Sequence, residues 1–152
     1  MNQQESTDTA LEAASERLRG AGYRVTKQRL AVCAFLQGNV SHPTVDDIYA
    51  GVKDVFPRMS VATVYKSVAS LIDIGLVKPI SRGLAATVYD ASTDEHAHFR
   101  CIHCNQITDV PIDQTAVARD ELDHCEIIGS SLEFYGFCAS CRRHKLGLAE
   151  RD

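Results

Sequence analysis

Residues 96–104 read His-Ala-His-Phe-Arg-Cys-Ile-His-Cys, and residues 138–141 read Cys-Ala-Ser-Cys. These stretches contain two Cys-x-x-Cys pairs, separated by residues 105–137. Each such turn brings two sulfurs together, and two turns complete a tetrahedral Zn²⁺ site. We therefore predict a structural zinc site that closes the intervening chain into one small domain. Its ligands are Cys101, Cys104, Cys138 and Cys141.

Redox-active dithiols and a chance pattern are the alternatives to zinc, although neither explains two matched pairs well. Because four sulfurs close the coordination sphere, the zinc would be structural and not catalytic. His103 lies inside the first pair as a redundant fifth ligand, so we expect it to be exposed to solvent. Cys33 falls on the apolar side of a predicted helix and is expected in the core. Cys125 has no partner pattern and receives no role.

Two histidines next to this quartet predict a second metal site. His96 and His98 lie two residues apart on a predicted strand, so both imidazoles point to the same face. Asp90 precedes them and Asp109 follows them, and such nitrogen and oxygen ligands suit Fe²⁺, Mn²⁺ or Zn²⁺. The alternative is a chance cluster on the surface. His42 is either a solvated loop residue or a further ligand that crosses from the N-terminal half.

Charge divides the chain into two modules. The net charge of −4 comes from 16 Lys+Arg and 20 Asp+Glu. Residues 1–84 hold ten basic and eight acidic residues, and residues 85–152 hold six basic and twelve acidic ones. Such a split indicates modules with different tasks. We assign residues 1–84 to one domain, 85–91 to a hinge and 92–152 to a second, metal-binding domain.

Hydrophobic spacing and capping residues predict that the first module is mainly helical. The expected helices cover residues 10–19, 26–38, 44–56 and 61–74, with Val55 on the buried side of the third. Two strands, at 76–80 and 85–89, are expected to form a hairpin. In the second module we expect strands at 96–100, 107–110, 127–128 and 132–137, and a helix at 114–122. The fold class is therefore α+β, with a winged helix-turn-helix followed by a small α/β domain.

The helix at 61–74 has the features of a recognition helix. When Val64 and Val68 face inward, a polar group at its N-terminal end faces solvent, and this end of a recognition helix enters the major groove of DNA. The group comprises Ala62, Thr63, Tyr65 and Lys66. Arg24, Arg58 and Arg82 can reach the DNA backbone from neighbouring segments. The alternative is an ordinary amphipathic helix, but the local excess of positive charge favours DNA.

The sequence excludes a membrane-spanning protein, because no apolar run approaches the ~18–20 residues that a membrane helix needs. The polar start, MNQQESTDTA, lacks the pattern of a secretory signal. We therefore expect a cytoplasmic protein whose thiols are reduced.

Several segments together resemble the ferric uptake regulator family of bacterial repressors. They are residues 22–29 (GYRVTKQR), 42–49 (HPTVDDIY), 60–66 (SVATVYK), 96–98 (HAH) and both Cys-x-x-Cys pairs. The resemblance covers about residues 15–145. It implies a winged-helix DNA-binding domain, an α/β dimerisation domain, a homodimer and metal-dependent binding to double-stranded operator DNA. By the same resemblance Tyr65 contacts a base and the cysteine quartet holds structural zinc.

Within that family the residues are most similar to the peroxide-sensing repressors, whose regulatory site has three His and two Asp. The matching positions here are His42, Asp90, His96, His98 and Asp109. Iron sensors typically have Glu where this chain has Asp109, and they often carry further ligands where it has Ala97 and residues 129–131. The resemblance implies regulatory Fe²⁺ or Mn²⁺, with Zn²⁺ as an alternative, and oxidation of His42 or His96 by peroxide. An iron- or zinc-uptake regulator is the alternative.

Two rivals come from other classes. A small metalloenzyme could use the His and Asp cluster for catalysis, but no separate general base or nucleophile is evident. A zinc-ribbon-like interaction module would leave the positive charge of the N-terminal half unexplained.

Overall fold

The computed structural model describes residues 3–37, 39–82, 85–92, 96–112, 124–126 and 130–146. By its internal contacts the chain divides into two units, residues 1–93 and 94–152. The predicted helix at 114–122, the predicted strand at 127–128 and the turn at 83–84 lie outside the described residues.

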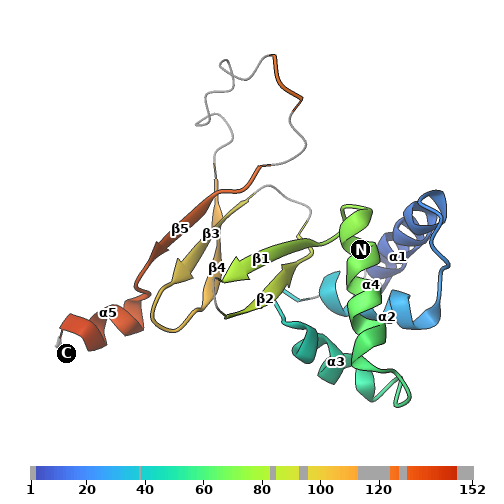
Figure 1. The fold of residues 1–152 in the computed structure, drawn as a ribbon, viewed down its shortest axis with the longest axis horizontal. Coiled ribbons are helices and arrows are strands. Elements are labelled where there is room, and N and C mark those ends of the chain that lie inside the picture. Colours follow the sequence, from blue (N-terminus) through green and yellow to red (C-terminus); the bar gives the residue numbers. More distant parts are fainter. Residues whose placement is uncertain are drawn as a thin grey trace. The chain divides into compact units, whose positions relative to one another are not determined.

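The described part of the first unit contains four helices. They are α1 (Gln3–Gly20), α2 (Lys27–Gln37), α3 (Val45–Lys53) and α4 (Val61–Asp73) (Figure 1). The Thr44 hydroxyl accepts the Asp47 N–H at 3.2 Å, and the Asp47 carboxylate accepts the Thr44 N–H at 2.9 Å. The shorter Asp thus completes a capping box in which Glu is more usual. Ser60 caps α4 by accepting the Thr63 N–H at 3.2 Å.

The core of this unit packs one apolar side of each helix together. Val64 and Val68 of α4 are buried, as predicted, in one cluster with residues of α1, α2 and α3. Gly51 of α3 faces the Phe35 ring of α2, where an added Cβ would come within 2.1 Å of a ring carbon. The prediction for Val55 is wrong, because α3 ends at Lys53 and Val55 lies 73% exposed in the turn beyond it.

A two-stranded antiparallel sheet completes the first unit. It pairs β1 (Lys78–Arg82) with β2 (Ala85–Asp90), with Ile80 opposite Val88. Val88 is buried, which fixes one face of the hairpin inward. The predicted hinge at 85–91 therefore includes the whole of β2.

The second unit is built on a sheet with the strand order β4-β3-β5. Its elements are β3 (His96–Cys101), β4 (Ile107–Pro111), β5 (Glu133–Gly136) and α5 (Ala139–Leu146). Strand β3 is antiparallel to β4 and parallel to β5. The α+β fold class is confirmed, whereas α5 was not predicted from the sequence. No helix in the described part of the chain is long and apolar enough to cross a membrane.

Candidate metal centres and nucleic-acid interface

The structure brings the four predicted zinc ligands together. Cys101 ends β3, Cys104 lies in the following turn, Cys138 directly precedes α5 and Cys141 lies in its first turn. Their sulfurs all lie within 4.8 Å of one another, and those of Cys104 and Cys138 are 3.9 Å apart. Thiolates bound at about 2.3 Å to a tetrahedral Zn²⁺ lie about 3.8 Å apart. The donor set and its spacing therefore fit zinc.

The local hydrogen bonds affect the four thiols unequally. Backbone N–H groups, first that of Cys104 and then that of Cys138, lower the pKa of Cys101 to about 6. The Ser140 hydroxyl is the largest cause that lowers the pKa of Cys138. The hydrogen bond with Cys138 is the largest cause that raises the pKa of Cys141 to about 12. Because zinc binds thiolates, binding must displace the proton of Cys141.

A tight turn between β3 and β4 connects the cysteine quartet to the histidine cluster. Asn105 has a left-handed backbone with φ of 57°, and its N–H donates to the Cys101 carbonyl at 2.9 Å. Beyond this turn the strands pair with His98 opposite Asp109. Directly paired residues point to the same face of a sheet. The turn that carries two zinc ligands therefore sets the register that places Asp109 beside the histidines.

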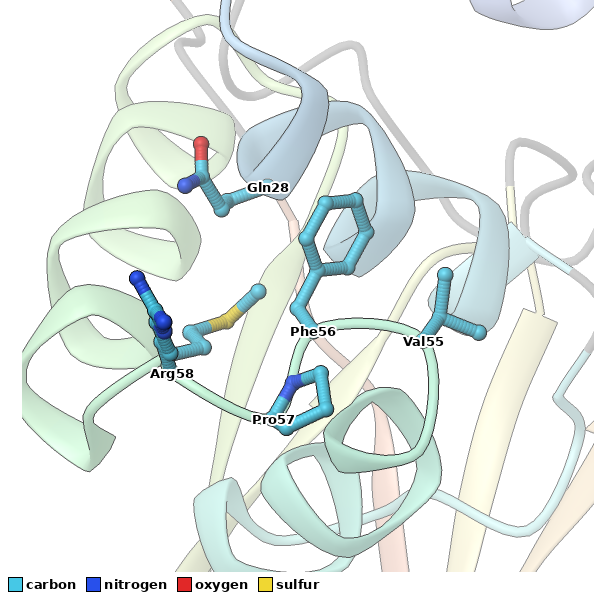
Figure 2. A pocket seen from close by; sticks show the side chains of 6 residues that line it. Gln28, Val55, Phe56, Pro57 and Arg58 are labelled. Carbon is cyan, nitrogen blue, oxygen red and sulfur yellow. The ribbon is translucent and has the colours of Figure 1, made fainter.

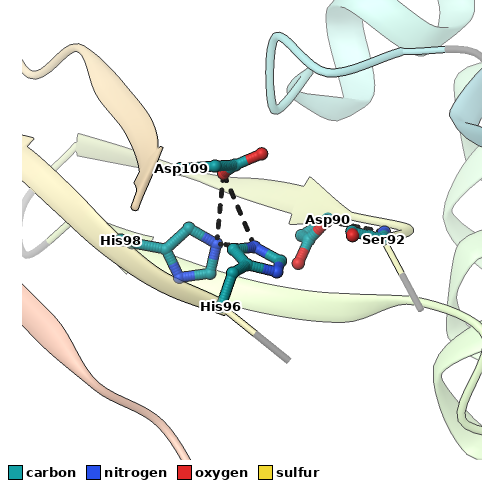
Figure 3. Close-up of polar contacts among 5 residues, drawn as sticks. All are labelled: Asp90, Ser92, His96, His98 and Asp109. Carbon is teal, nitrogen blue, oxygen red and sulfur yellow. Dashed lines mark hydrogen bonds and ion pairs between the residues drawn. The ribbon is translucent and has the colours of Figure 1, made fainter. Parts of the chain in front are cut away.

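His96, His98 and Asp109 form a group of nitrogen and oxygen atoms on that face (Figure 3). The Nε2 atoms of His96 and His98 are 2.9 Å apart. Asp109 Oδ1 lies 3.5 Å from His96 Nε2 and 3.7 Å from His98 Nε2. Two nitrogens bound at right angles to one ion at about 2.1 Å would lie about 3.0 Å apart. Both histidine side chains are about nine-tenths buried, whereas that of Asp109 is 37% exposed. The group fits a divalent cation.

The other two predicted ligands, His42 and Asp90, belong to the first unit, and each is 5% exposed. Asp90 ends β2, and its Oδ1 accepts the Ser92 N–H at 2.7 Å. The neighbouring Tyr89 N–H donates to the Pro43 carbonyl at 3.0 Å, which holds the His42 loop against this end of β2. The reading of His42 as a solvated loop residue is wrong, because the side chain is buried.

The remaining cysteines and His103 differ in their surroundings. Cys33 is buried in the core, as predicted, and burial raises the pKa of its thiol to about 11. Cys125 is exposed. His103 is exposed as expected, yet its Nδ1 lies 3.4 Å from the Cys141 sulfur. The sequence offered no signal for this contact except the position of His103 inside the Cys-x-x-Cys turn.

The predicted DNA-contacting residues surround the start of α4. Ala62, Tyr65 and Lys66 are exposed, and Thr63 is half-buried with its hydroxyl 3.0 Å from that of Ser60. Arg24 and Arg58 are exposed as well. The side chain of Arg82 lies outside the described part of the structure.

A shallow pocket of about 320 Å³ lies at the turn that leads into α4 (Figure 2). Its lining combines apolar side chains with one amide, that of Gln28, and one cation, that of Arg58. Arg58 lies two residues before Ser60, the N-cap of α4, and therefore at the same end of this helix as Thr63.

A helical unit with a two-stranded wing, followed by a sheet unit with a four-cysteine cluster, defines a class of metal-binding transcription regulator. Residues 20–135 match the ferric uptake regulator family, and the chain belongs to this family. It is 35% identical over 141 residues to the peroxide-responsive repressor PerR of Staphylococcus epidermidis, a match that covers 91% of this chain and 94% of that protein.

Two solved structures have a similar fold. PerR from Streptococcus pyogenes, described as a peroxide sensor and gene regulator, has a TM-score of 0.50 at 32% identity, covering 87% of this chain and 92% of that one. The Helicobacter pylori ferric uptake regulator Fur, described with three functional metal-binding sites, has a TM-score of 0.77 at 19% identity. This match covers 93% of this chain and 97% of that one, and it shows the fold alone.

The family membership decides between the classes considered above. The protein is a metal-dependent transcription regulator and not an enzyme, so the small metalloenzyme is excluded. A regulator of this family binds operator DNA, which accounts for the positive charge that a zinc-ribbon-like module would leave unexplained.

Proposed function

We propose that the protein is a cytoplasmic, peroxide-sensing repressor that binds operator DNA when its regulatory site holds Fe²⁺ or Mn²⁺. The observation that carries the proposal is the convergence of His96, His98 and Asp109 on one face of the sheet. Its mixed nitrogen and oxygen donors suit Fe²⁺ and Mn²⁺. The 35% identity with a peroxide-responsive repressor supports the peroxide assignment, while the all-sulfur quartet is proposed to hold structural Zn²⁺.

His42 and Asp90 complete the proposed regulatory site with two ligands from the first unit. His42 is buried and has a left-handed backbone with φ of 52°. Such a conformation costs a non-glycine residue about 1–2 kcal/mol, and strain of this kind is concentrated at functional sites. The buried Asp90 carboxylate supplies a second negative charge for a divalent ion. Metal binding would therefore favour the arrangement of the units in which all five ligands meet.

Peroxide would end repression by destroying one ligand. His42, Asp90, His96, His98 and Asp109 would hold the ion, and Fe²⁺ at this site would activate peroxide. A ligand histidine, His42 or His96, would take one oxygen atom from peroxide, and the other oxygen would leave as water. The oxidised ring binds metal more weakly, so the metal and the DNA are released together. Mn²⁺ would support DNA binding with little response to peroxide.

The surface at the start of α4 is proposed to read the major groove. Tyr65 and Ala62 would contact base edges or methyl groups, Thr63 the neighbouring backbone or base, and Lys66 a phosphate. Arg24 and Arg58 would hold phosphates on either side. We place DNA binding in residues 1–84, a hinge at 85–91 and dimerisation in residues 92–152.

A homodimer is proposed because β5, the outer strand of the sheet among the described residues, carries exposed apolar side chains. Phe134 is 48% and Tyr135 is 73% exposed, and β5 follows β3 in the order β4-β3-β5. Strand edges with apolar residues favour pairing with another chain. A dimer would carry two α4 helices, as required to read two operator half-sites, which lie about 34–36 Å apart.

An operator-binding titration tests the proposed function. Zinc-loaded protein would be mixed with operator DNA, selected from random duplexes, in the presence of Fe²⁺, Mn²⁺ or Zn²⁺, and peroxide would then be added. We expect binding with Fe²⁺ and Mn²⁺ and release by peroxide only with Fe²⁺. A complex with Fe²⁺ that survives peroxide would favour the iron-uptake regulator, and binding that requires added Zn²⁺ would favour the zinc-uptake regulator.

A further inference from the structure

The two Cys-x-x-Cys turns carry a polar side chain at the same position. In Cys101-Ile-His-Cys104 the third residue is His103, and in Cys138-Ala-Ser-Cys141 it is Ser140. Neither residue belongs to the regulatory site described above. Both are exposed. Ile102, the second residue of the first turn, is also exposed, at 48%, but its side chain is apolar.

Each of these polar side chains lies against a different sulfur of the quartet. The Ser140 hydroxyl is 3.3 Å from the sulfur of Cys138, in its own turn. His103 Nδ1 is 3.4 Å from the sulfur of Cys141, so it joins the β3–β4 turn to α5. A zinc-bound thiolate accepts hydrogen bonds and does not donate them, so the hydroxyl and the ring N–H are the donors.

Three cysteines of the quartet are accessible to solvent: Cys104 is exposed, and Cys138 and Cys141 are half-buried. Cys101 is buried, and its sulfur accepts the Cys138 backbone N–H at 3.4 Å. Cys138 and Cys141 are half-buried, and they receive the side-chain donors. Ser140 and His103 thus lie against the sulfurs of the two half-buried cysteines, which burial alone covers only in part.

A hydrogen bond to a thiolate stabilises its negative charge and reduces its reactivity towards oxidants. When a thiolate attacks peroxide, its sulfur takes one oxygen, the O–O bond breaks and hydroxide leaves, so the cysteine becomes a sulfenic acid. Zinc binds the thiolate form. Oxidation of one ligand would therefore open the quartet and release its zinc.

We propose that His103 and Ser140 are positioning residues that protect the zinc thiolates of Cys141 and Cys138 from peroxide. They slow the loss of structural zinc, so that the zinc site survives the exposure that the regulatory site senses. The inference rests on the proposed peroxide function only for the relevance of the oxidant, because the protective contacts belong to the zinc site alone.

The test measures zinc release from the full-length protein in the absence of iron. Zinc-loaded protein, stripped of other metals, would be mixed with excess hydrogen peroxide and a chromophoric zinc indicator. His103→Ala and Ser140→Ala should each release zinc about two to ten times faster than the unchanged protein, as expected for the loss of one ordinary hydrogen bond. His103→Gln and Ser140→Thr, which keep a donor, should restore most of the protection.

Ile102→Ala is the matched control, since it shortens an exposed side chain in the same turn without removing a donor to sulfur. Equal release rates for His103→Ala, Ser140→Ala and Ile102→Ala would overturn the proposal. If an alanine variant fails to retain zinc, the second measurement compares zinc release from His103→Gln and Ser140→Thr, which keep a donor, with release from His103→Leu and Ser140→Val, which fill the space without a donor. Faster release from the variants without a donor is expected, and equal rates would contradict the proposal.

The outcome of this experiment does not depend on whether the proposed function is correct. Zinc-release rates need neither DNA nor a regulatory metal, so unchanged rates would remove the role of His103 and Ser140 and leave peroxide sensing intact. Conversely, if the iron-loaded protein kept its DNA in the presence of peroxide, the zinc-release comparison would not change.

Discussion

The cysteine quartet and the histidine cluster lie on the same small sheet but are built in different ways. The quartet joins two tight turns, and its sulfurs lie within 4.8 Å of one another. The histidine cluster depends on strand alternation and register, because His98 faces Asp109 across β3 and β4. Local turns produce a site of one ligand type, whereas register produces a face of mixed ligands. The first suits a structural ion and the second an exchangeable one.

The largest expected effect comes from opening the quartet. Cys104→Ser should lose the zinc and unfold the second unit, because a structural Zn²⁺ contributes about 10 kcal/mol or more to folding. Zinc content and thermal unfolding of the full chain measure the effect. Cys125→Ser, which alters an exposed cysteine outside the quartet, should retain both zinc and stability.

Removing one histidine should separate the two sites. His98→Ala is expected to keep the zinc and the folded sheet, but to weaken Mn²⁺ binding and Mn²⁺-dependent operator binding at least tenfold, since one of the proposed ligands is lost. Isothermal titration and DNA-binding curves provide the measurement. His124→Ala removes an exposed histidine as a control, and an equal loss in both variants would contradict the proposed site.

A change in the recognition surface should leave both metal sites intact. Tyr65 is 56% exposed on α4, and Tyr65→Ala should weaken operator binding by about 1–3 kcal/mol while zinc and Mn²⁺ binding stay unchanged. Ala69→Ser, at an exposed position one turn further along the same helix, should bind DNA normally. If Tyr65→Ala also binds normally, α4 does not read bases through Tyr65.

The smallest structural change alters the carboxylate ligand of the histidine cluster. Asp109→Glu keeps the charge and extends the carboxylate by one methylene group beside His96 and His98. We expect Fe²⁺-dependent operator binding to persist and sensitivity to peroxide to fall several-fold, which is measured as the peroxide concentration that releases half of the DNA. Unchanged sensitivity would show that Asp109 does not determine the response.

Local signals in the sequence predicted most of the fold. Thr44 and Ser60 begin helices by binding backbone N–H groups within three residues, and Val64 and Val68 have the helical spacing of a buried side. Val55 continued this apolar spacing past the true end of α3, so periodicity alone placed it wrongly. The helix α5 has a weak apolar pattern, begins directly after Cys138 and contains Cys141.

The metal ligands that lie close together in the sequence could be predicted from their spacing. Two Cys-x-x-Cys turns and a His-x-His strand specify their own geometry, so those ligands were evident from the sequence. The burial of His42 and the contact between His103 and Cys141 depend on segments distant in the chain. No local pattern encodes such contacts.

Mass spectrometry of the histidine-containing peptides tests the central claim most directly. Protein loaded with structural zinc and Fe²⁺ would be treated with peroxide, digested and compared with protein loaded with Mn²⁺. We predict one added oxygen on the peptide that contains His42 or His96 in the iron-loaded protein, and unmodified peptides in the manganese-loaded protein. Unmodified His42 and His96 in iron-loaded protein that has released its DNA would contradict the account.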